Sequence, residues 1–534
     1  MKLQTLLAAG VLVGSVTAHA AEPQGTLQQQ IERMQKMIEQ QQQQLQQQQL
    51  QLQELQQTLQ QQAAAAAPRE RELAALQQLS QREQLVEQEA PRLTVTNSRP
   101  TITSADGRNS LSVRANVQLD AGRHADGDEG PLNSDFRRGS IGGAGNRETN
   151  AARDFSDGAY FRRARFGIEG AIARDFNYRL LLELGGSGTE GPTRVNDAWI
   201  NYTGFAPFII QFGAFSPPAN MDDGTTPEDL LFIERASAAE LSRTLGGADG
   251  RLGLGLRGSG TRWFGALTLT SRTVNDAEVF DSQTAAVGRF GVLAATSANY
   301  NVHLGLSGTY VLSPPDQGSS AAPPRRAIRL RDRPEIRIDG TRLIDTGAID
   351  AAHAEAFGVE FGANYRNFYL QAENFWFGVD RRNSLTAVDF DGYYLQGSWV
   401  LTGESRRYNV ASGSFQNSRP FVPVSFAARG IGAFELAARF SHVDLNDAAG
   451  RAGVAALADA IRGGEQDIFT LGLNWYLNAN FKLLLNYLDI SVDRLNPMGV
   501  GNLTPFGAAP ATPPPGVEIG QDLEVYALRA QYSF

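Results

Sequence analysis

The chain ends in Tyr526-Ala-Leu-Arg-Ala-Gln-Tyr-Ser-Phe534, a stretch in which two kinds of residue alternate. In an extended backbone, one face carries the mainly apolar and aromatic positions Tyr526, Leu528, Ala530 and Tyr532. The opposite face carries the mostly polar positions Ala527, Arg529, Gln531 and Ser533. A period of two predicts a β-strand with one apolar face and one wet face. Such a strand fits the edge of a soluble sandwich or the wall of a transmembrane barrel.

The start of the chain favours the barrel. Lys2, the apolar run from Leu6 to Val16 and the small-residue segment Ala18-His-Ala20 have the order of a secretory signal, so we expect residues 1–20 to be a signal peptide. No later stretch approaches the roughly 18 apolar residues of a membrane-spanning helix. The aromatic residue Phe534, closing an alternating strand, resembles the C-terminal signal of bacterial outer-membrane barrels. We therefore expect an exported barrel rather than a sandwich.

Other segments repeat the alternating pattern. Residues 111–121 alternate apolar with polar side chains over a length that suits a tilted strand crossing a bilayer. Residues 176–184 and 434–440 follow the same pattern. Aromatic residues of the kind found in interfacial girdles fall near predicted strand ends: Trp199, Tyr202, Trp399, Trp475, Tyr476 and Tyr487. Residues 94–534 are therefore predicted to be one all-β domain, a transmembrane antiparallel β-barrel.

A different pattern precedes the barrel. Apolar residues follow alternating steps of four and three, as in a heptad repeat: Leu27, Ile31, Met34, Ile38, Leu45, Leu52, Leu55 and Leu59. Gln41, Gln48 and Gln62 occupy the remaining core positions. We predict a glutamine-rich α-helical coiled coil over residues 21–67, with a disordered polyglutamine tract as the alternative. Pro68 is expected to end that helix, and residues 68–93 are expected to be a second helical segment and linker.

Composition excludes several functions. The formal net charge of −9 argues against nucleic-acid binding through bulk positive charge, and the absence of cysteine excludes disulfides and thiolate chemistry. The five histidines are scattered singly, without metal-ligand spacing. A glycine pattern at residues 253–258 lacks the following helix of a dinucleotide site. Asp222, Asp223, Glu228 and Asp229 could bind calcium, but we favour ordinary loop charges. We expect no catalytic residues, no cofactor and no metal.

Two internal segments suggest what the barrel contains. Residues 216–250 follow a strand pattern at 208–215 and include a helical pattern at 230–241 that is too apolar for a free loop. We predict that this loop folds into the lumen as a constriction. The other long irregular segments are expected at the outer end, where barrels place their long loops: 123–156, 313–325, 404–420 and 495–517.

An arginine ladder occupies residues 327–339. Its even spacing puts four guanidinium groups on one face of an extended strand: Arg329, Arg331, Arg333 and Arg337. The other face carries Ile328, Leu330, Ile336 and Ile338, which we predict to contact lipid while the arginines line the lumen. Glu335 on a rung and Asp332 on the lipid face fit this strand poorly, so Arg329 and Arg331 are the firmer positions. The alternative is that the arginines neutralise lumenal carboxylates.

The chain resembles the phosphate-selective porins O and P. The similar segments run in order along the barrel: Thr101–Arg108, Phe161–Gly170, Asn196–Ile200, Phe232–Arg235, Arg333–Glu335, Asp345–Gly347, Leu401–Glu404, Gly432–Arg439, Gly472–Tyr476 and Asn486–Tyr487. The resemblance implies about 16 strands, a homotrimer in the outer membrane of a Gram-negative bacterium, and passage of inorganic phosphate, polyphosphate or other small anions through an arginine-lined eyelet.

The resemblance also implies site residues. The ladder arginines would bind anions, Arg163 and Arg165 would lie near the eyelet, and Arg235 and Arg243 would lie on the constriction loop. The family also carries lysines around its eyelet, whereas this barrel has one lysine, Lys482. Two alternatives therefore stay open. One is a general or organic-solute porin without phosphate selectivity, and the other is a barrel that tethers the envelope through a periplasmic coiled coil reaching peptidoglycan.

Overall fold

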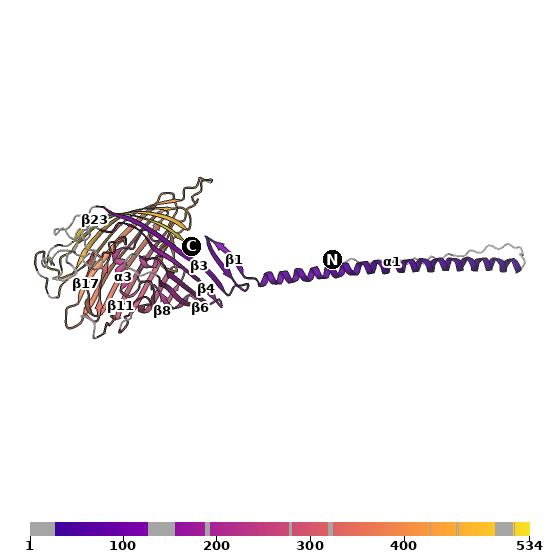
Figure 1. The fold of residues 1–534 in the computed structure, drawn as a ribbon, viewed down its shortest axis with the longest axis horizontal. Coiled ribbons are helices and arrows are strands. Elements are labelled where there is room, and N and C mark those ends of the chain that lie inside the picture. The colour runs from indigo at the N-terminus through magenta and orange to yellow at the C-terminus, as the bar shows by residue number, and fades with distance from the viewer. Residues whose placement is uncertain are drawn as a thin grey trace, which may run out of the picture. The chain divides into compact units, whose positions relative to one another are not determined.

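The computed structural model describes residues 27–125, 155–186, 193–276, 280–318, 324–427, 429–454, 456–457, 459–496, 516, 518 and 520–534 (Figure 1). The chain divides into two compact units, Met1–Glu89 and Ala90–Phe534. The expected signal peptide at residues 1–20 lies outside the described residues.

The first unit contains one helix. Helix α1 runs from Leu27 to Glu89 without a break, so the expected division at Pro68 is wrong. Proline removes one backbone hydrogen bond, but five alanines precede it, and alanine has the highest helix propensity. The heptad residues that the structure describes are exposed, for example Ile38 at 54% and Leu52 at 59%. Among the described residues, no helix is long and apolar enough to cross a bilayer.

The second unit is a closed barrel of sixteen antiparallel strands, as predicted. Each strand pairs with its neighbour in chain order, and β23 closes the barrel by pairing with β3, from Glu524 opposite Ala125 to Ser533 opposite Asn116. The strands are β3 (Ser110–Ala125), β4 (Gly158–Ile172), β5 (Phe176–Glu183), β6 (Arg194–Phe205), β7 (Phe208–Phe215), β8 (Arg251–Ser259), β9 (Trp263–Thr273), β10 (Thr284–Thr296), β11 (Tyr300–Ser313), β15 (Ile349–Tyr365), β16 (Phe368–Arg381), β17 (Val388–Val400), β20 (Ala433–Asp447), β21 (Ile461–Tyr476), β22 (Phe481–Asp493) and β23 (Gln521–Ser533).

A small hairpin precedes the barrel. Strand β1 (Arg92–Thr96) pairs with β2 (Arg99–Thr103), and β2 pairs with the first residues of β3, Thr101 lying opposite Ser112. The hairpin thus extends the barrel sheet at the end where β3 starts.

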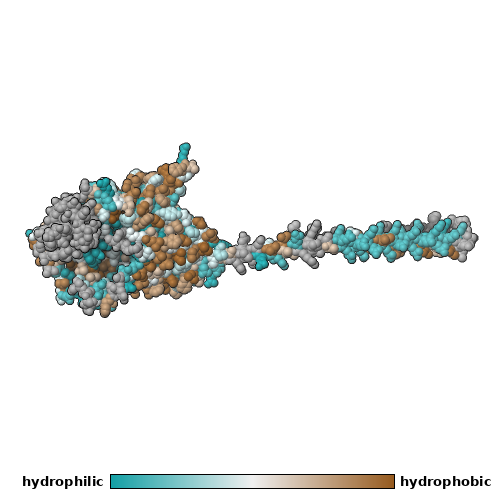
Figure 2. Space-filling view, viewed as in Figure 1, coloured by the Kyte–Doolittle hydropathy of each residue, from teal (hydrophilic) through white to brown (hydrophobic). Residues whose placement is uncertain are grey.

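The outer wall has an apolar band, and at one end of this band polar and apolar residues exchange faces of the sheet. This exchange is called the reversal of alternation below. In β23, Tyr526 and Leu528 point outward, and Arg529 is buried inside. Beyond Tyr526 the outward positions carry the acidic residues Glu524 and Asp522, and the inward positions carry the apolar residues Val525 and Leu523. Strands β17, β20, β21 and β22 switch in the same way. The apolar band covers much of the visible wall (Figure 2) and is the surface that a bilayer core would cover.

Within the described residues, three long connections enter the lumen, the third of them only over the stretch that contains the buried residues Glu404, Arg406, Phe415 and Ser418. The first, residues 216–250, carries α2 (Met221–Gly224) and α3 (Ser237–Gly246), and α3 contacts six barrel strands, which confirms that this loop lies inside. The second, residues 324–348, carries β12 (Ala327–Ile328), β13 (Arg331–Asp332) and β14 (Ile344–Asp345). The third, residues 401–432, carries β18 (Arg407–Asn409) and β19 (Ser414–Gln416).

The third connection corrects an expectation. It joins β17 to β20 at the end where the other connections are short turns, such as 366–367 between β15 and β16. Length alone therefore misplaced it at the long-loop end. Its residue Arg406 bonds Glu435 of β20 at 3.2 Å, and Phe415 packs on Tyr369 with ring centroids 4.9 Å apart. These contacts hold it inside the barrel.

The ladder segment is not a lipid-facing strand. Ile328, Leu330 and Ile336 are buried in a core formed with α3 and the inward faces of the wall, and Ile338 packs against that core. The wall supplies residues on the inward side of the reversed alternation, including Val443, Leu445, Ile490, Val492, Leu523 and Val525. The aliphatic face therefore contacts the interior of the barrel, which provides an apolar surface of its own.

Candidate functional site: an arginine-rich lumenal cavity

The main candidate site is a cavity of about 250 Å³ between the wall and the first two lumenal loops. Nine arginines line it: Arg162, Arg163, Arg194, Arg235, Arg243, Arg331, Arg333, Arg337 and Arg342. Five carboxylates join them: Glu234, Glu240, Asp249, Asp276 and Asp332. The lining therefore carries a formal surplus of positive charge, although the whole chain is acidic. Six of the eight predicted arginines are in this lining.

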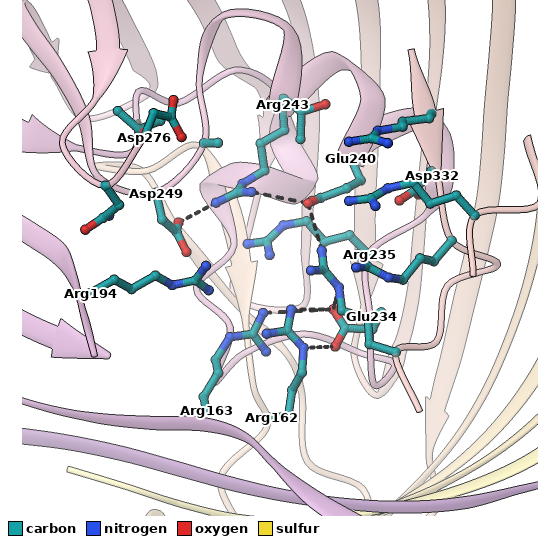
Figure 3. Close-up of a pocket in the computed structure, with 18 of the residues that line it drawn as sticks. Arg162, Arg163, Arg194, Glu234, Arg235, Glu240, Arg243, Asp249, Asp276 and Asp332 are labelled. Carbon is teal, nitrogen blue, oxygen red and sulfur yellow. Dashed lines mark hydrogen bonds and ion pairs between the residues drawn. The ribbon is translucent and has the colours of Figure 1, made fainter. Parts of the chain in front are cut away.

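Strand β4 delivers two adjacent arginines to the lumen. Gln118 of β3 pairs with Arg163 and the next residue, Leu119, pairs with Phe161, so Arg162 is an extra residue in β4. A bulge of this kind re-aims a side chain that regular alternation would point outward. Both Arg162 and Arg163 are buried and point toward Glu234 (Figure 3). Arg165 follows on the inner face and bonds Glu183 at 2.7 Å and Asp249 at 2.8 Å.

Glu234 on the first lumenal loop collects several guanidinium groups. Its carboxylate accepts from Arg162 at 2.6 Å and from Arg529 at 3.2 Å, and lies 3.7 Å from Arg337. Burial alone would raise the pKa of Glu234, but the surrounding arginines hold it well below its usual range. Glu234 is therefore ionised, and it fixes the wall and both loops around one charge.

Helix α3 and the residues after it form the other side of the cavity. Arg243 lies between Glu240 and Asp249 (Figure 3) and donates to Asp223 at 2.6 Å. Arg235 donates instead to backbone oxygens, at 2.8 Å to Thr225 and 3.3 Å to Asp222. These two predicted arginines thus brace the loop, and their charge still faces the cavity.

The ladder arginines have separate environments. Arg329 points away from the cavity, where it is partly exposed and pairs with Asp345 at 2.7 Å. Arg337 donates to Glu240 at 3.1 Å, and Arg333 is buried in the lining. Arg331 lines the cavity, as does Arg342 from the same loop. Neither of these two has a side-chain hydrogen bond or ion pair within the described part of the chain.

The pKa shifts of these two arginines fit that lack of partners. Burial, followed by the charge of Arg329, lowers the pKa of Arg331. Burial, followed by the charge of Arg331, lowers the pKa of Arg342. Arginine stays charged despite such shifts. Asp345 acts in the opposite direction on both arginines, as Asp332 does on Arg342, so these carboxylates offset part of the repulsion, and an anion between the two arginines would offset more of it.

Asp332 adds a titratable group. Its side chain is buried in the cavity lining rather than facing lipid. Burial raises the pKa of this carboxyl to about 7, and the negative charge of Glu240 acts in the same direction against Arg337 and Arg333. The formal charge of the cavity therefore depends on pH near neutrality.

Sequence reasoning missed Arg162, Arg194 and Arg342. Arg162 has the wrong parity for an inward residue, and only the bulge brings it inside. Arg194 starts β6, and Arg342 follows the assumed ladder on the same loop. Arg342 could have been found by extending the search for cations past residue 339. The carboxylates of residues 222–229, considered for calcium, include Asp223, which pairs with Arg243 instead.

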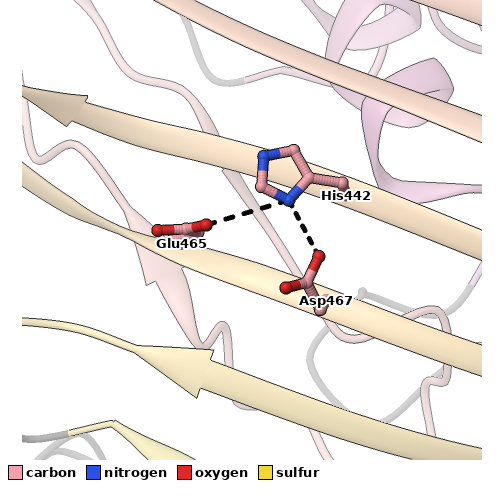
Figure 4. A group of neighbouring side chains, drawn as sticks. All are labelled: His442, Glu465 and Asp467. Atoms are coloured by element: carbon pink, nitrogen blue, oxygen red, sulfur yellow. Dashed lines mark hydrogen bonds and ion pairs between the residues drawn. The ribbon is translucent and has the colours of Figure 1, made fainter.

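A second charged group lies on the outside of the barrel. His442 of β20 bonds Asp467 of β21 at 2.8 Å and lies 3.9 Å from Glu465 (Figure 4). All three are on outward-facing positions beyond the apolar band. They face away from the cavity and take no part in a path through the lumen.

A closed barrel with an apolar outer band and a charged lumen is an outer-membrane porin. Residues 130–499 match the family described as phosphate-selective porin O and P, and the chain belongs to that family. Porin O of Pseudomonas aeruginosa is 25% identical over 352 residues, which cover 64% of this chain and 78% of that protein. An uncharacterised protein of Caulobacter vibrioides is 24% identical over 424 residues, covering 77% and 74% of the two chains.

Solved barrels also resemble the structure. An anion-selective porin from Comamonas acidovorans is 12% identical, with a TM-score of 0.44 over 80% of this chain and 100% of that one. OmpT, an outer-membrane protein of Vibrio cholerae, is 12% identical with a TM-score of 0.42, over 80% of this chain and 98% of that one.

Proposed function

We propose that the protein is a passive porin for small anions, with inorganic phosphate or polyphosphate as the preferred solutes. The observation that carries this proposal is the pair Arg331 and Arg342, which line an arginine-rich cavity and make no side-chain hydrogen bond or ion pair with the described residues. The other predicted arginines, Arg163, Arg165, Arg235, Arg243, Arg333 and Arg337, supply the surrounding field. Membership of the family supports phosphate in particular.

Arginine suits this task chemically. Its planar fork binds two oxygens of a phosphate at once, and it keeps its charge in a low-dielectric passage. Most guanidinium groups around the cavity share carboxylates, which moderates their attraction for an anion. Moderate binding lets an ion leave as well as enter, whereas a deep unpaired site would trap it.

Planar-bilayer recording tests the proposal. The purified protein should pass chloride in preference to potassium, and added phosphate should reduce the chloride current. Replacing both Arg331 and Arg342 by alanine should weaken that phosphate effect about tenfold, because the two unpaired charges are lost. Arg325→Ala is the matched control, since Arg325 belongs to the same connection but pairs with Asp316 and does not line the cavity.

Three outcomes would contradict the proposal. Cation preference would exclude an anion porin. An anion current that phosphate does not reduce would leave a general or organic-solute porin. An equal effect of Arg325→Ala and the double variant would remove Arg331 and Arg342 from the path.

We further propose that the functional form is a homotrimer joined by α1 in the periplasm. The exposed heptad residues of a 63-residue helix support this role, because an isolated helix gains little stability without packing. Attachment to peptidoglycan is a separate possibility that a sedimentation assay with purified cell wall tests. Loss of binding on removal of residues 27–89 would support attachment, and unchanged binding would contradict it.

A further inference from the structure

A hairpin at the short-turn end exposes an unusual amount of apolar surface. It belongs to the 401–432 connection and closes where the backbones of Ser425 and Gly430 exchange hydrogen bonds of 3.1 and 3.0 Å. Phe426 is fully exposed, Phe421 is 75% exposed and Ile431 is 61% exposed. Contiguous apolar side chains on a surface mark a site that something else covers.

The base of the hairpin is fixed to the outer wall. Trp475 of β21 donates from Nε1 to the backbone oxygen of Ile431 at 2.8 Å. The backbone N–H of Val424 donates to Leu477, at the turn between β21 and β22, at 2.8 Å. Trp475 also stacks on Phe434, with ring centroids 5.5 Å apart and an interplanar angle of 8°. The exposed side chains therefore continue from an aromatic pair on outward-facing positions of the lipid-facing wall.

The charge of this stretch differs from the rest of the chain. Residues 405–434 contain no aspartate or glutamate, although the chain has 57 acidic residues. The hairpin itself carries one charged side chain, Arg429, near Phe426 and exposed. Aromatic rings beside a basic residue are the composition of segments that lie at the boundary between headgroups and acyl chains. A long basic side chain can reach the headgroups from that depth.

We propose that the described residues of this hairpin, 421–427 and 429–431, are an interfacial anchor that inserts Phe421, Phe426 and Ile431 into the phospholipid leaflet at the short-turn end. Arg429 contacts the anionic headgroups of that leaflet. The anchor adds a monotopic contact to the transmembrane wall. It is independent of ion selectivity, because Phe421, Phe426, Arg429 and Ile431 are exposed and none of them lines the cavity.

The absence of cysteine makes site-specific labelling direct. The variant Phe426→Cys, labelled with an environment-sensitive fluorophore and reconstituted in phospholipid vesicles, is compared with two controls. Leu436→Cys lies on the apolar band, and Ala298→Cys lies in the exposed short turn between β10 and β11 at the same end. Quenching by brominated lipid at position 426 should be within about twofold of that at 436 and about fivefold above that at 298.

Quenching at 426 equal to that at 298 would overturn the proposal. Cross-linking of Phe426→Cys chains to one another, with shielding from both water and lipid, would overturn it in favour of a second copy as the occupant. Arg429→Gln tests the headgroup contact. It should reduce quenching at 426 in phosphatidylglycerol vesicles and leave it unchanged in phosphatidylcholine, and an equal effect in both would contradict a contact with anionic headgroups.

Discussion

At the residue scale, Asp332 couples the cavity to pH. Its raised pKa of about 7 means that the carboxyl is mostly neutral below that pH and mostly negative above it. The cavity therefore gains net positive charge as the pH falls. We expect the ratio of anion to cation permeability to rise about twofold between about pH 8 and about pH 6, since a single lumenal charge strongly alters the local potential. Reversal potentials in a salt gradient measure this ratio.

The variant Asp332→Asn separates this residue from other titrating groups. Its permeability ratio should stay near the acidic value of the wild type across the whole range. The same shift has a consequence for stability, because between the ordinary carboxyl pKa of about 4 and the folded value of about 7 the folded state binds one more proton than the unfolded chain. The free energy of unfolding therefore falls as the pH rises through this interval and is constant above about 7. Asp332→Asn should thus melt higher than wild type at about pH 8 and by a smaller margin at about pH 5, and a pH-independent difference would contradict this assignment.

At the scale of elements, Glu335 holds two lumenal loops to the wall. Its carboxylate accepts the N–H of Ser237, at the start of α3, at 2.9 Å and the hydroxyl of Ser441 at 2.5 Å, and it pairs with Arg439. Removing one partner of a buried ion pair costs about 3–5 kcal/mol. Glu335→Ala should therefore release the 324–348 loop, raise single-channel conductance and expose that loop to protease.

Glu355→Ala is the control for this experiment. Glu355 is an exposed glutamate on β15, so its loss removes the same charge without freeing a loop. If both variants conduct and resist protease as the wild type does, Glu335 does not hold the loops.

The sequence predicted correctly those elements whose residue pattern has only one structural explanation. Alternation in β23 identified a wall strand, and the apolar content of residues 216–250 placed that loop inside. The arginine ladder allowed two interpretations, contact with lipid or contact with the barrel interior. A repeat of two residues shows that one face of the segment is apolar, but it does not show what that face contacts. Here the contact is the inner wall, whose apolar residues, such as Val525 and Leu523, follow the reversal of alternation after Ala527. That reversal was visible in the sequence, whereas the bulge at Arg162 depends on strand pairing and was not.

At the scale of the whole molecule, the reversal of alternation marks where the bilayer ends. On β17, β20, β21 and β22 an acidic row lies beyond the apolar band, one row past His442 and Asp467: Asp391, Asp444, Glu465 and Asp493, paired in register. Like charges directly opposite one another destabilise a sheet and would be far more costly in hydrocarbon. The barrel wall therefore extends beyond the bilayer core at its long-loop end. The lumenal loops that line the cavity pack against the inner face of this part of the wall.

The first unit gives a separate prediction about assembly. Since α1 continues through Pro68, the heptad register can be followed from Leu59 across Ala66 and Arg69 to Leu73 and Leu76 without a break. Pro68 falls between the core positions, so a coiled coil can pass it.

We expect Leu45→Gln with Leu52→Gln to lower the temperature at which the trimer dissociates by about 5–10 °C, because two core layers are lost. Leu50→Gln, equally exposed but off the seam, should leave it unchanged. Conductance of the barrel should be the same in all three proteins, which gel electrophoresis after heating and bilayer recording measure together. A similar loss of trimer in the Leu50 variant would indicate general helix destabilisation instead of a packed seam.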